Sequence, residues 1–171
     1  MNAGDQKAAF LALSSNEKYL VWIQHLADFK KNIRLSDGQL NSINFVISQL
    51  IPSTFQENTA ENIRFKSIEP DIHLRFRNLF GDALSKTILN SLQNISYLNL
   101  KKSVSSITPD VALPVDCGCS TKSDYCSCPD NVAPYHCPSC VAGGCNTSSA
   151  GCGTLWLYSC GGTCQGSIGG E

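Results

Sequence analysis

The chain has 171 residues, ten cysteines and a formal net charge of −1. Because positive and negative side chains nearly balance, we expect neither nucleic acid nor an anionic membrane as an electrostatic partner. A membrane-spanning helix needs about eighteen or more consecutive apolar residues. No stretch of the sequence approaches that length, so we expect no transmembrane segment and a soluble protein.

Capping signals followed by apolar stripes predict two helices. Ser14-Ser-Asn-Glu17 has the form of a capping box, and the stripe behind it runs to about residue 32. Ser36-Asp-Gly-Gln39 repeats the signal, and Pro52 ends the second helix because proline cannot donate to the helical ladder. The stripes consist of Tyr19, Trp22, Ile23, Leu26 and Phe29, then Leu40, Ile43, Val46, Ile47 and Leu50.

The pattern weakens after a polar connector at residues 53–62. A third helix is predicted from near Pro70-Asp71 to Gly81, and a fourth from Asp82. Residues 1–102 are therefore interpreted as an α-helical leader-like or carrier-like region, with three to four helices in a small bundle. His25 and His73 lie in these helical stretches, where we expect partly exposed surface residues and not ligands or bases.

Residues 103–115, which contain Pro109 and Pro114, have the composition of an extended linker. The helical region carries a net charge of +2 up to residue 110, and the remainder carries −3. Cysteine usage changes at the same place. We therefore expect few contacts across the linker and a separate domain at residues 116–171.

The ten cysteines occupy the 48 positions from Cys117 to Cys164, about one in five. That density is far above the roughly 8–10% that marks a disulfide scaffold. With one sizeable apolar run, such a segment cannot offset the entropy of ordering its backbone, so cross-links should define a small loop/β domain. The predicted disulfide-bonded residues are Cys117, Cys119, Cys126, Cys128, Cys137, Cys140, Cys145, Cys152, Cys160 and Cys164.

Spacing leaves the pairing of these cysteines open, and it leaves a metal alternative. Cys137-Pro-Ser-Cys140 beside His136 could supply part of a tetrahedral zinc site. A zinc ribbon would show a second C-x-x-C at a fixed distance, and the sequence has none. We therefore favour disulfides over bound metal, and both over thioether cross-links to Ser and Thr. On this interpretation the protein needs no cofactor.

Two segments of the tail resemble a known family. They are Asp116-Cys-Gly-Cys-Ser-Thr-Lys-Ser-Asp-Tyr-Cys126 and Ser149-Ala-Gly-Cys-Gly-Thr-Leu-Trp-Leu-Tyr-Ser-Cys-Gly-Gly-Thr-Cys164. Together they are similar to the bacteriocin fulvocin C-related proteins, in which a helical region precedes a short disulfide-bonded domain. The resemblance covers about residues 116–164. It implies a secreted or periplasmic bacterial protein with an antimicrobial role and a target on a bacterial cell surface.

The apolar run of the tail has two interpretations. It is either a strand that fills a tiny core, or an aromatic surface that contacts a target. The candidate target contacts are Leu155, Trp156, Leu157 and Tyr158. We interpret Gly143-Gly144, just before Cys145, as a turn.

No G-x-S-x-G, H-E-x-x-H or P-loop motif is present, so we expect a binding protein and not an enzyme. A secreted bacteriocin-like protein is the favoured function. An intracellular metal-binding module and an extracellular structural or inhibitor-like module are the alternatives.

Overall fold

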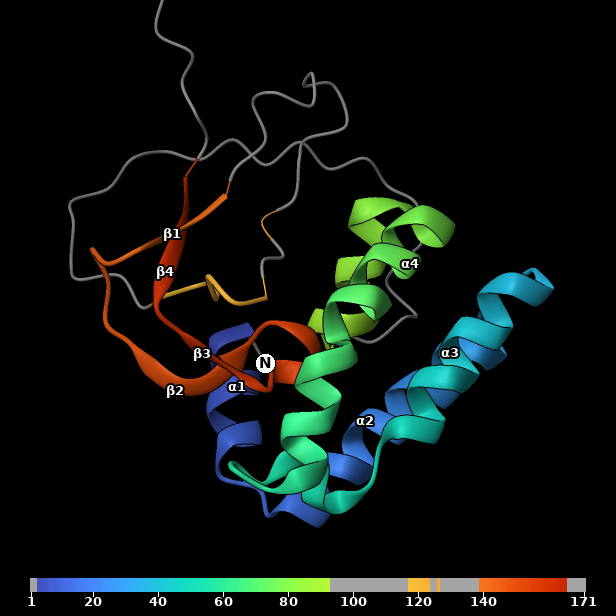
Figure 1. Cartoon of the computed structure of the whole chain (residues 1–171), viewed down its shortest axis with the longest axis horizontal. Helices are drawn as coiled ribbons and strands as arrows, with labels where there is room; N and C mark the ends of the chain where they lie inside the picture. Colours follow the sequence, from blue (N-terminus) through green and yellow to red (C-terminus); the bar gives the residue numbers. More distant parts are fainter. Residues whose placement is uncertain (1–2, 93–116, 124–125, 127–138, 166–171) are drawn as a thin grey trace, which may run out of the picture.

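A computed structural model describes residues 3–92, 117–123, 126 and 139–165 of the chain. Helices form the first part and short strands the last part, which confirms the predicted fold class (Figure 1). The helical elements are α1 (Ala3–Leu11), α2 (Ser15–Asn32), α3 (Asp37–Gln49), the 3-10 helix η1 (Pro52–Phe55) and α4 (Ala60–Asn90). The tail contains β1 (Ser139–Ala142), β2 (Ser148–Cys152), the 3-10 turn η4 (Thr154–Trp156), β3 (Tyr158–Cys160) and β4 (Gly162–Gln165).

Both predicted capping boxes are present. The Ser14 hydroxyl accepts a hydrogen bond from the Glu17 amide, and the Glu17 carboxylate accepts one from the Ser14 amide at 2.8 Å. Ser36 and Gln39 make the same exchange at the start of α3. These bonds satisfy amides that have no partner within the first turn of a helix, which is why α2 and α3 begin where the sequence predicts.

Helix α1 was not predicted as a helix. Its residue Phe10 is buried in the core. The Phe10 ring lies edge-on to the Trp22 ring, with 6.4 Å between the ring centroids. Phe10 thus packs this N-terminal helix against the shared core.

Helix α4 corrects the predicted third helix. It begins ten residues before Pro70, where the Thr59 hydroxyl accepts a hydrogen bond from the Asn62 amide at 3.1 Å. Pro70 lies inside the helix at an exposed position. The expectation of a start at Pro70 was wrong because Phe65, Ile72 and Phe76 already form one buried stripe at helical spacing. Burial of that stripe outweighs the single backbone hydrogen bond that proline removes.

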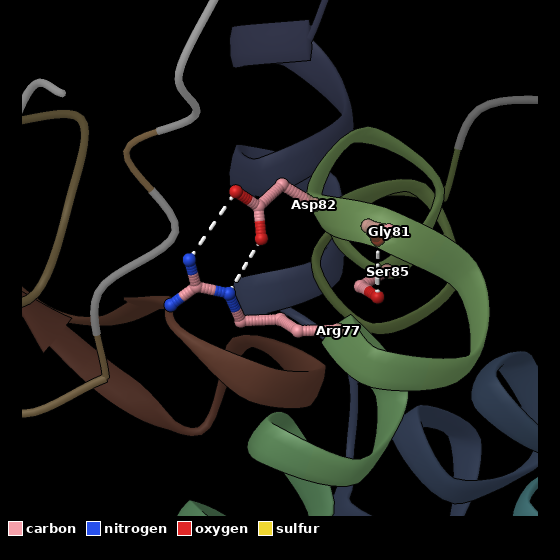
Figure 2. Close-up of polar contacts among 4 residues, drawn as sticks. All are labelled: Arg77, Gly81, Asp82 and Ser85. Atoms are coloured by element: carbon pink, nitrogen blue, oxygen red, sulfur yellow. Dashed lines mark hydrogen bonds and ion pairs between the residues drawn. The ribbon is translucent and has the colours of Figure 1, made fainter. Parts of the chain in front are cut away.

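The predicted break at Gly81 coincides with a kink in α4. Gly81 has φ 76° and ψ 168°, a conformation open almost only to glycine. Figure 2 shows how side chains bracket the kink: Arg77 donates two hydrogen bonds to the Asp82 carboxylate, and the Ser85 hydroxyl donates to the Gly81 carbonyl at 2.7 Å. The helix therefore changes direction here without ending.

The strands form two small antiparallel sheets. β1 pairs with β4, which places Cys140 opposite Cys164. β2 pairs with β3 with an irregularity between Ser148 and Cys152. A two-stranded sheet is marginal on its own in water, so the tail needs additional support from cross-links and from the helices.

The helices and the tail share one hydrophobic core. Phe10 and Trp22 from the helices belong to the same buried cluster as Leu155 and Trp156 from the tail. The expectation of few contacts between the two regions is therefore wrong: a tail with too little apolar surface gains it from the helices. The predicted boundaries of the linker, residues 103–115, lie outside the described residues.

Candidate functional site

Four disulfides cross-link the described part of the tail. They join Cys117 to Cys145, Cys119 to Cys140, Cys126 to Cys164, and Cys152 to Cys160. Cys128 and Cys137, which sequence analysis also assigned to disulfides, lie outside the described residues. The bridges close loops whose ends are 8 to 38 positions apart, so they restrict the unfolded chain over nearly the whole described tail.

The shortest loop, closed by Cys152 and Cys160, contains the predicted aromatic segment. This segment is a tight turn and not the strand that was predicted, except for Tyr158 at the start of β3. Leu155 and Trp156 have φ values of 54° and 57°, in the left-handed region that side chains other than glycine rarely occupy. Such a turn persists only when its surroundings hold it in place.

Trp156 is held by the helices. Only 3% of its surface is exposed, and its ring lies edge-on to Phe10 at 5.1 Å and to Trp22 at 5.9 Å. Its indole N–H donates to the carbonyl of Asn90, the last residue of α4, at 3.1 Å. The helical region therefore buries the apolar ring of Trp156 and also accepts the hydrogen bond from its indole N–H.

All four candidate target contacts are buried: Leu155, Trp156, Leu157 and Tyr158. In the folded chain these residues do not form an exposed surface. The structure agrees instead with the other interpretation, in which Trp156 fills a core. That core is shared with the helices. A target could reach these side chains only after the tail separates from them.

A buried carboxylate joins the same two regions. Glu69 of α4 is 2% exposed and accepts hydrogen bonds from three hydroxyl groups of the tail. The donors are Ser123 at 2.9 Å, Thr154 at a short distance, and Tyr158 at 3.3 Å. A buried charge is costly unless it is hydrogen-bonded, so these three donors make the position of Glu69 tolerable and fix the tail against α4.

The environment keeps the Tyr158 hydroxyl protonated. Burial raises the pKa of Tyr158 well above its ordinary range, and the negative charge of Glu69 and the hydrogen bond to it add to the effect. The Lys66 ammonium lies 5.3 Å from the centre of the Tyr158 ring. Tyr158 is therefore a stable donor to Glu69 near neutral pH.

Sequence analysis missed Glu69, although the sequence contains a signal for it. Glu69 falls on the same helical face as Phe65, Ile72 and Phe76, at spacings of four, three and seven residues. An acidic residue within an apolar stripe must find buried partners. Its partners come from segments 54 to 89 positions away, which no local pattern could identify.

Glycine at position 153 is needed for this contact. Gly153 has a φ of +67°, and a methyl group on its Cα would lie 2.6 Å from the Ser123 Cβ and 2.6 Å from a ring carbon of Tyr158. The loop at Ser123 and the start of β3 can therefore approach each other only because residue 153 has no side chain.

The expectation that His25 is a surface residue was wrong. His25 is 8% exposed, and its Nε2 lies 3.2 Å from the carbonyl oxygen of Ile88. Burial lowers the pKa of His25, with a smaller opposing effect from hydrogen bonding to backbone carbonyls. Its ring meets Trp22 edge-on at 5.3 Å, so it is part of the helical core. His73 is half-buried, as expected of a partly exposed residue.

Three cysteine sulfurs lie close together in the described tail, two of them because Cys119 and Cys140 form a disulfide. The Sγ atoms of Cys119, Cys126 and Cys140 all lie within 4.8 Å of one another. Of the zinc ligands suggested by the sequence, His136 and Cys137 lie outside the described residues, and Cys140 is bonded to Cys119. The structure thus groups Cys140 with cysteines that spacing alone did not select.

No protein-family model, no curated protein and no solved structure matches this chain. The resemblance to fulvocin C-related proteins therefore stays a proposal. Among the described residues, no helix combines the length and the apolar character that crossing a membrane requires.

Proposed function

We propose that the protein is a secreted bacteriocin-like protein whose cysteine-rich tail binds a target on a bacterial cell surface. The coarser description is clear: residues 117–165, as far as they are described, fit a small binding domain stabilised by disulfides. The proposed antibacterial role rests, in addition, on the resemblance of residues 116–164 to the fulvocin C-related proteins.

The observation that carries the proposal is the oxidised state of all eight described cysteines. Stable disulfides in a small domain are typical of proteins that work outside the reducing cytosol. An extracellular or periplasmic location therefore follows as part of the proposal.

The helices act in this proposal as a carrier that covers the aromatic turn. Phe10, Trp22 and Asn90 enclose Trp156, and Glu69 binds the surrounding hydroxyl groups. Separation of the tail from the helices would expose Leu155, Trp156, Leu157 and Tyr158 together. They would then form the tail's concentrated apolar contact for a target.

The test is growth inhibition of a panel of bacteria. The oxidised full chain is compared with a chain carrying an inserted protease site between residues 103 and 115, before and after cutting. We expect inhibition that increases on cutting and is abolished when the disulfides are reduced and alkylated. Leu20→Ala, an exposed change on α2, is the matched control and should behave as the parent chain. Lack of inhibition by both the intact and the cut oxidised chains across the panel would refute the antibacterial role.

A further inference from the structure

A cleft opens where the helices meet the tail. Its apolar lining comes from Phe10 and Phe55 of the helical region and from Trp156 and Leu157 of the aromatic turn. The cleft has a volume of about 230 Å³. Pockets for drug-sized ligands measure about 300–1,000 Å³, so this cleft suits a smaller molecule. Because both regions supply its lining, it exists only while the tail is docked.

Lys18 supplies a positive charge to this lining. Its ammonium lies 5.6 Å from the centre of the Phe10 ring, which holds the charge over the apolar part of the cleft. In the described part of the chain, Lys18 takes part in no ion pair and donates no hydrogen bond. Its N–H groups are therefore available to an anionic group of a ligand.

Glu57 supplies a negative charge to the same lining, and its side chain is exposed. The turn that carries it is fixed by the Thr59 hydroxyl, which lies 2.6 Å from the Ser53 carbonyl oxygen and 3.0 Å from that of Gln56. Burial lowers the pKa of Lys66, and the charge of Glu57 opposes this effect, yet the two residues form no ion pair within the described ranges. The carboxylate can therefore accept hydrogen bonds from a cationic group.

A buried amide oxygen completes the polar lining. Asn62 is 3% exposed, and its Nδ2 donates to the Thr54 carbonyl at 2.7 Å, which fixes the orientation of the side-chain amide. No group among the described residues donates to its Oδ1. In this part of the chain, the polar side-chain atoms sealed from solvent without a partner are Trp22 Nε1 and Asn90 Oδ1. The Asn62 oxygen is thus open to the cleft and offers a second acceptor.

The charges of the lining favour a zwitterion. A ligand with a carboxylate alone would be attracted by Lys18 and repelled by Glu57, and a ligand with an amine alone would meet the reverse. A molecule that carries both groups satisfies both charges, and its ammonium provides donors for the two acceptors. The apolar part of the cleft requires an apolar side chain on the same molecule.

We propose that the cleft binds one free amino acid with an apolar side chain, such as leucine or phenylalanine. Its α-carboxylate accepts hydrogen bonds from Lys18, and its α-ammonium donates to Glu57 and to the Asn62 Oδ1. Its side chain packs on Phe55 and Trp156. The bound molecule contacts both regions, so it stabilises the docked tail. This inference goes beyond the antibacterial proposal and does not depend on it.

The experiment titrates the oxidised full chain with L-leucine and with L-phenylalanine in a calorimeter at neutral pH. We expect one molecule per chain with a dissociation constant below about 1 mM, an affinity within reach of a ligand of this size. The proposal is wrong if neither amino acid binds with that affinity.

Three analogues test which groups of the ligand are recognised. N-acetyl-L-leucine lacks the ammonium, L-leucinamide lacks the α-carboxylate, and L-serine lacks the apolar side chain. Each should bind about 10-fold more weakly than L-leucine, the scale of one charge-assisted hydrogen bond or one buried apolar group. L-leucinamide also represents the first residue of a peptide. If any analogue binds as tightly as L-leucine, the cleft does not recognise an apolar zwitterion.

Two charge variants assign the groups to residues. In Lys18→Gln, L-leucine should lose its advantage over L-leucinamide, and in Glu57→Gln it should lose its advantage over N-acetyl-L-leucine. Lys31→Gln and Asp71→Asn change exposed charges outside the cleft and should keep both advantages. Advantages that persist in the two test variants, or that disappear equally in the two controls, would contradict the proposed contacts.

A variant that fills the cleft leaves both charges in place. Ala150 is half-buried in β2 and belongs to the lining. We expect Ala150→Leu to abolish L-leucine binding, and Ala27→Leu, at an exposed position of α2, to leave it unchanged. Added L-leucine should raise the urea midpoint of the parent chain but not that of Ala150→Leu.

Helical circular dichroism and peptide mapping of the four bridges check that Ala150→Leu folds, and the charge variants decide the question if it does not. A folded Ala150→Leu chain with the parent affinity would place the ligand elsewhere and overturn the proposal. Calorimetry requires no bacteria, so its failure is distinct from a failure of growth inhibition.

Discussion

The helices and the cysteine-rich tail are stabilised by different means. Residues 3–92 bury large side chains such as Trp22, Phe29, Phe65 and Phe76 against one another. The described tail buries a cluster of cysteines, and its two sheets have only two strands each. Packing stabilises the first region, and covalent bridges stabilise the second.

The comparison shows that an abrupt change in composition along the chain need not mark a boundary between separately packed domains. Charge and cysteine usage change sharply beyond residue 110. Nevertheless, Trp156 lies between Phe10 and Trp22, and Glu69 binds the hydroxyl groups of Thr154 and Tyr158. The two regions therefore depend on each other: the bridges shape a turn, and the helices bury it.

Trp156→Ala should have the largest effect on this dependence. Removing a buried aromatic side chain costs about 3–5 kcal/mol, because it loses apolar burial and leaves a cavity. We expect that loss in the free energy of unfolding, measured by urea titration with the helical signal as readout. Leu20→Ala, at a position that is 53% exposed, should change it by less than about 0.5 kcal/mol.

The disulfides provide a second observation on the same variant. If Trp156→Ala leaves the stability of the helices unchanged and peptide mapping shows the four native bridges, the shared core is not important for either region. Loss of helical stability with the bridges intact is the outcome that we expect, because the bridges lie within the tail.

Glu69→Gln should have an intermediate effect. The amide keeps the shape of the carboxylate but replaces one acceptor with a donor, which faces hydroxyl groups that already donate. An unsatisfied buried polar group costs about 1–3 kcal/mol, and we expect a loss of that size in a urea titration. Asp71→Asn, an exposed change on the same helix, is the control. Equal stabilities of the two variants would show that Glu69 does not connect the regions.

Changes of pH should have the smallest effects on the free energy of unfolding. Acid should act through the helical core and alkali through the tail. The pKa of His25 in the helical core is lowered in the folded chain, so unfolding takes up a proton and stability falls as pH drops below about 6.5. The pKa of Tyr158 is raised, so unfolding releases a proton and stability falls as pH rises above about 10.

Urea titrations across this pH range check both signs. We expect His25→Gln to flatten the acid side alone and Tyr158→Phe to flatten the alkaline side alone. The loss of stability at alkaline pH depends on the burial of Tyr158 against α4. An unchanged alkaline slope in Tyr158→Phe would therefore mean that the tail is not docked as described.

Local patterns predicted much of the helical region. Ser14 and Ser36 begin α2 and α3 because a capping box involves residues only three positions apart. The start of α4 was missed because Thr59 caps it without a capping box, and Pro70 suggested a later start. Gly81 was predicted as the end of a helix because glycine is common just past helix ends, and the structure has a kink within α4 at this residue.

The site was less predictable because its contacts join distant segments. Nothing near Trp156 in the sequence indicates Phe10 or Asn90 as partners. The pairing of the eight described cysteines is likewise a property of the folded backbone, which joins Cys140 to Cys119, 21 positions away. Density of cysteine predicts cross-linking, but not its geometry.

The most direct test of the shared core is the effect of reducing the disulfides on the helices. The urea midpoint of the helical circular dichroism is measured for the oxidised and the reduced full chain, each with Trp156 and with Trp156→Ala. We predict that reduction lowers the midpoint, and that Trp156→Ala lowers it much less in the reduced chain, because both changes remove the same docked turn. A helical midpoint that is the same in the oxidised and the reduced chain would contradict the account.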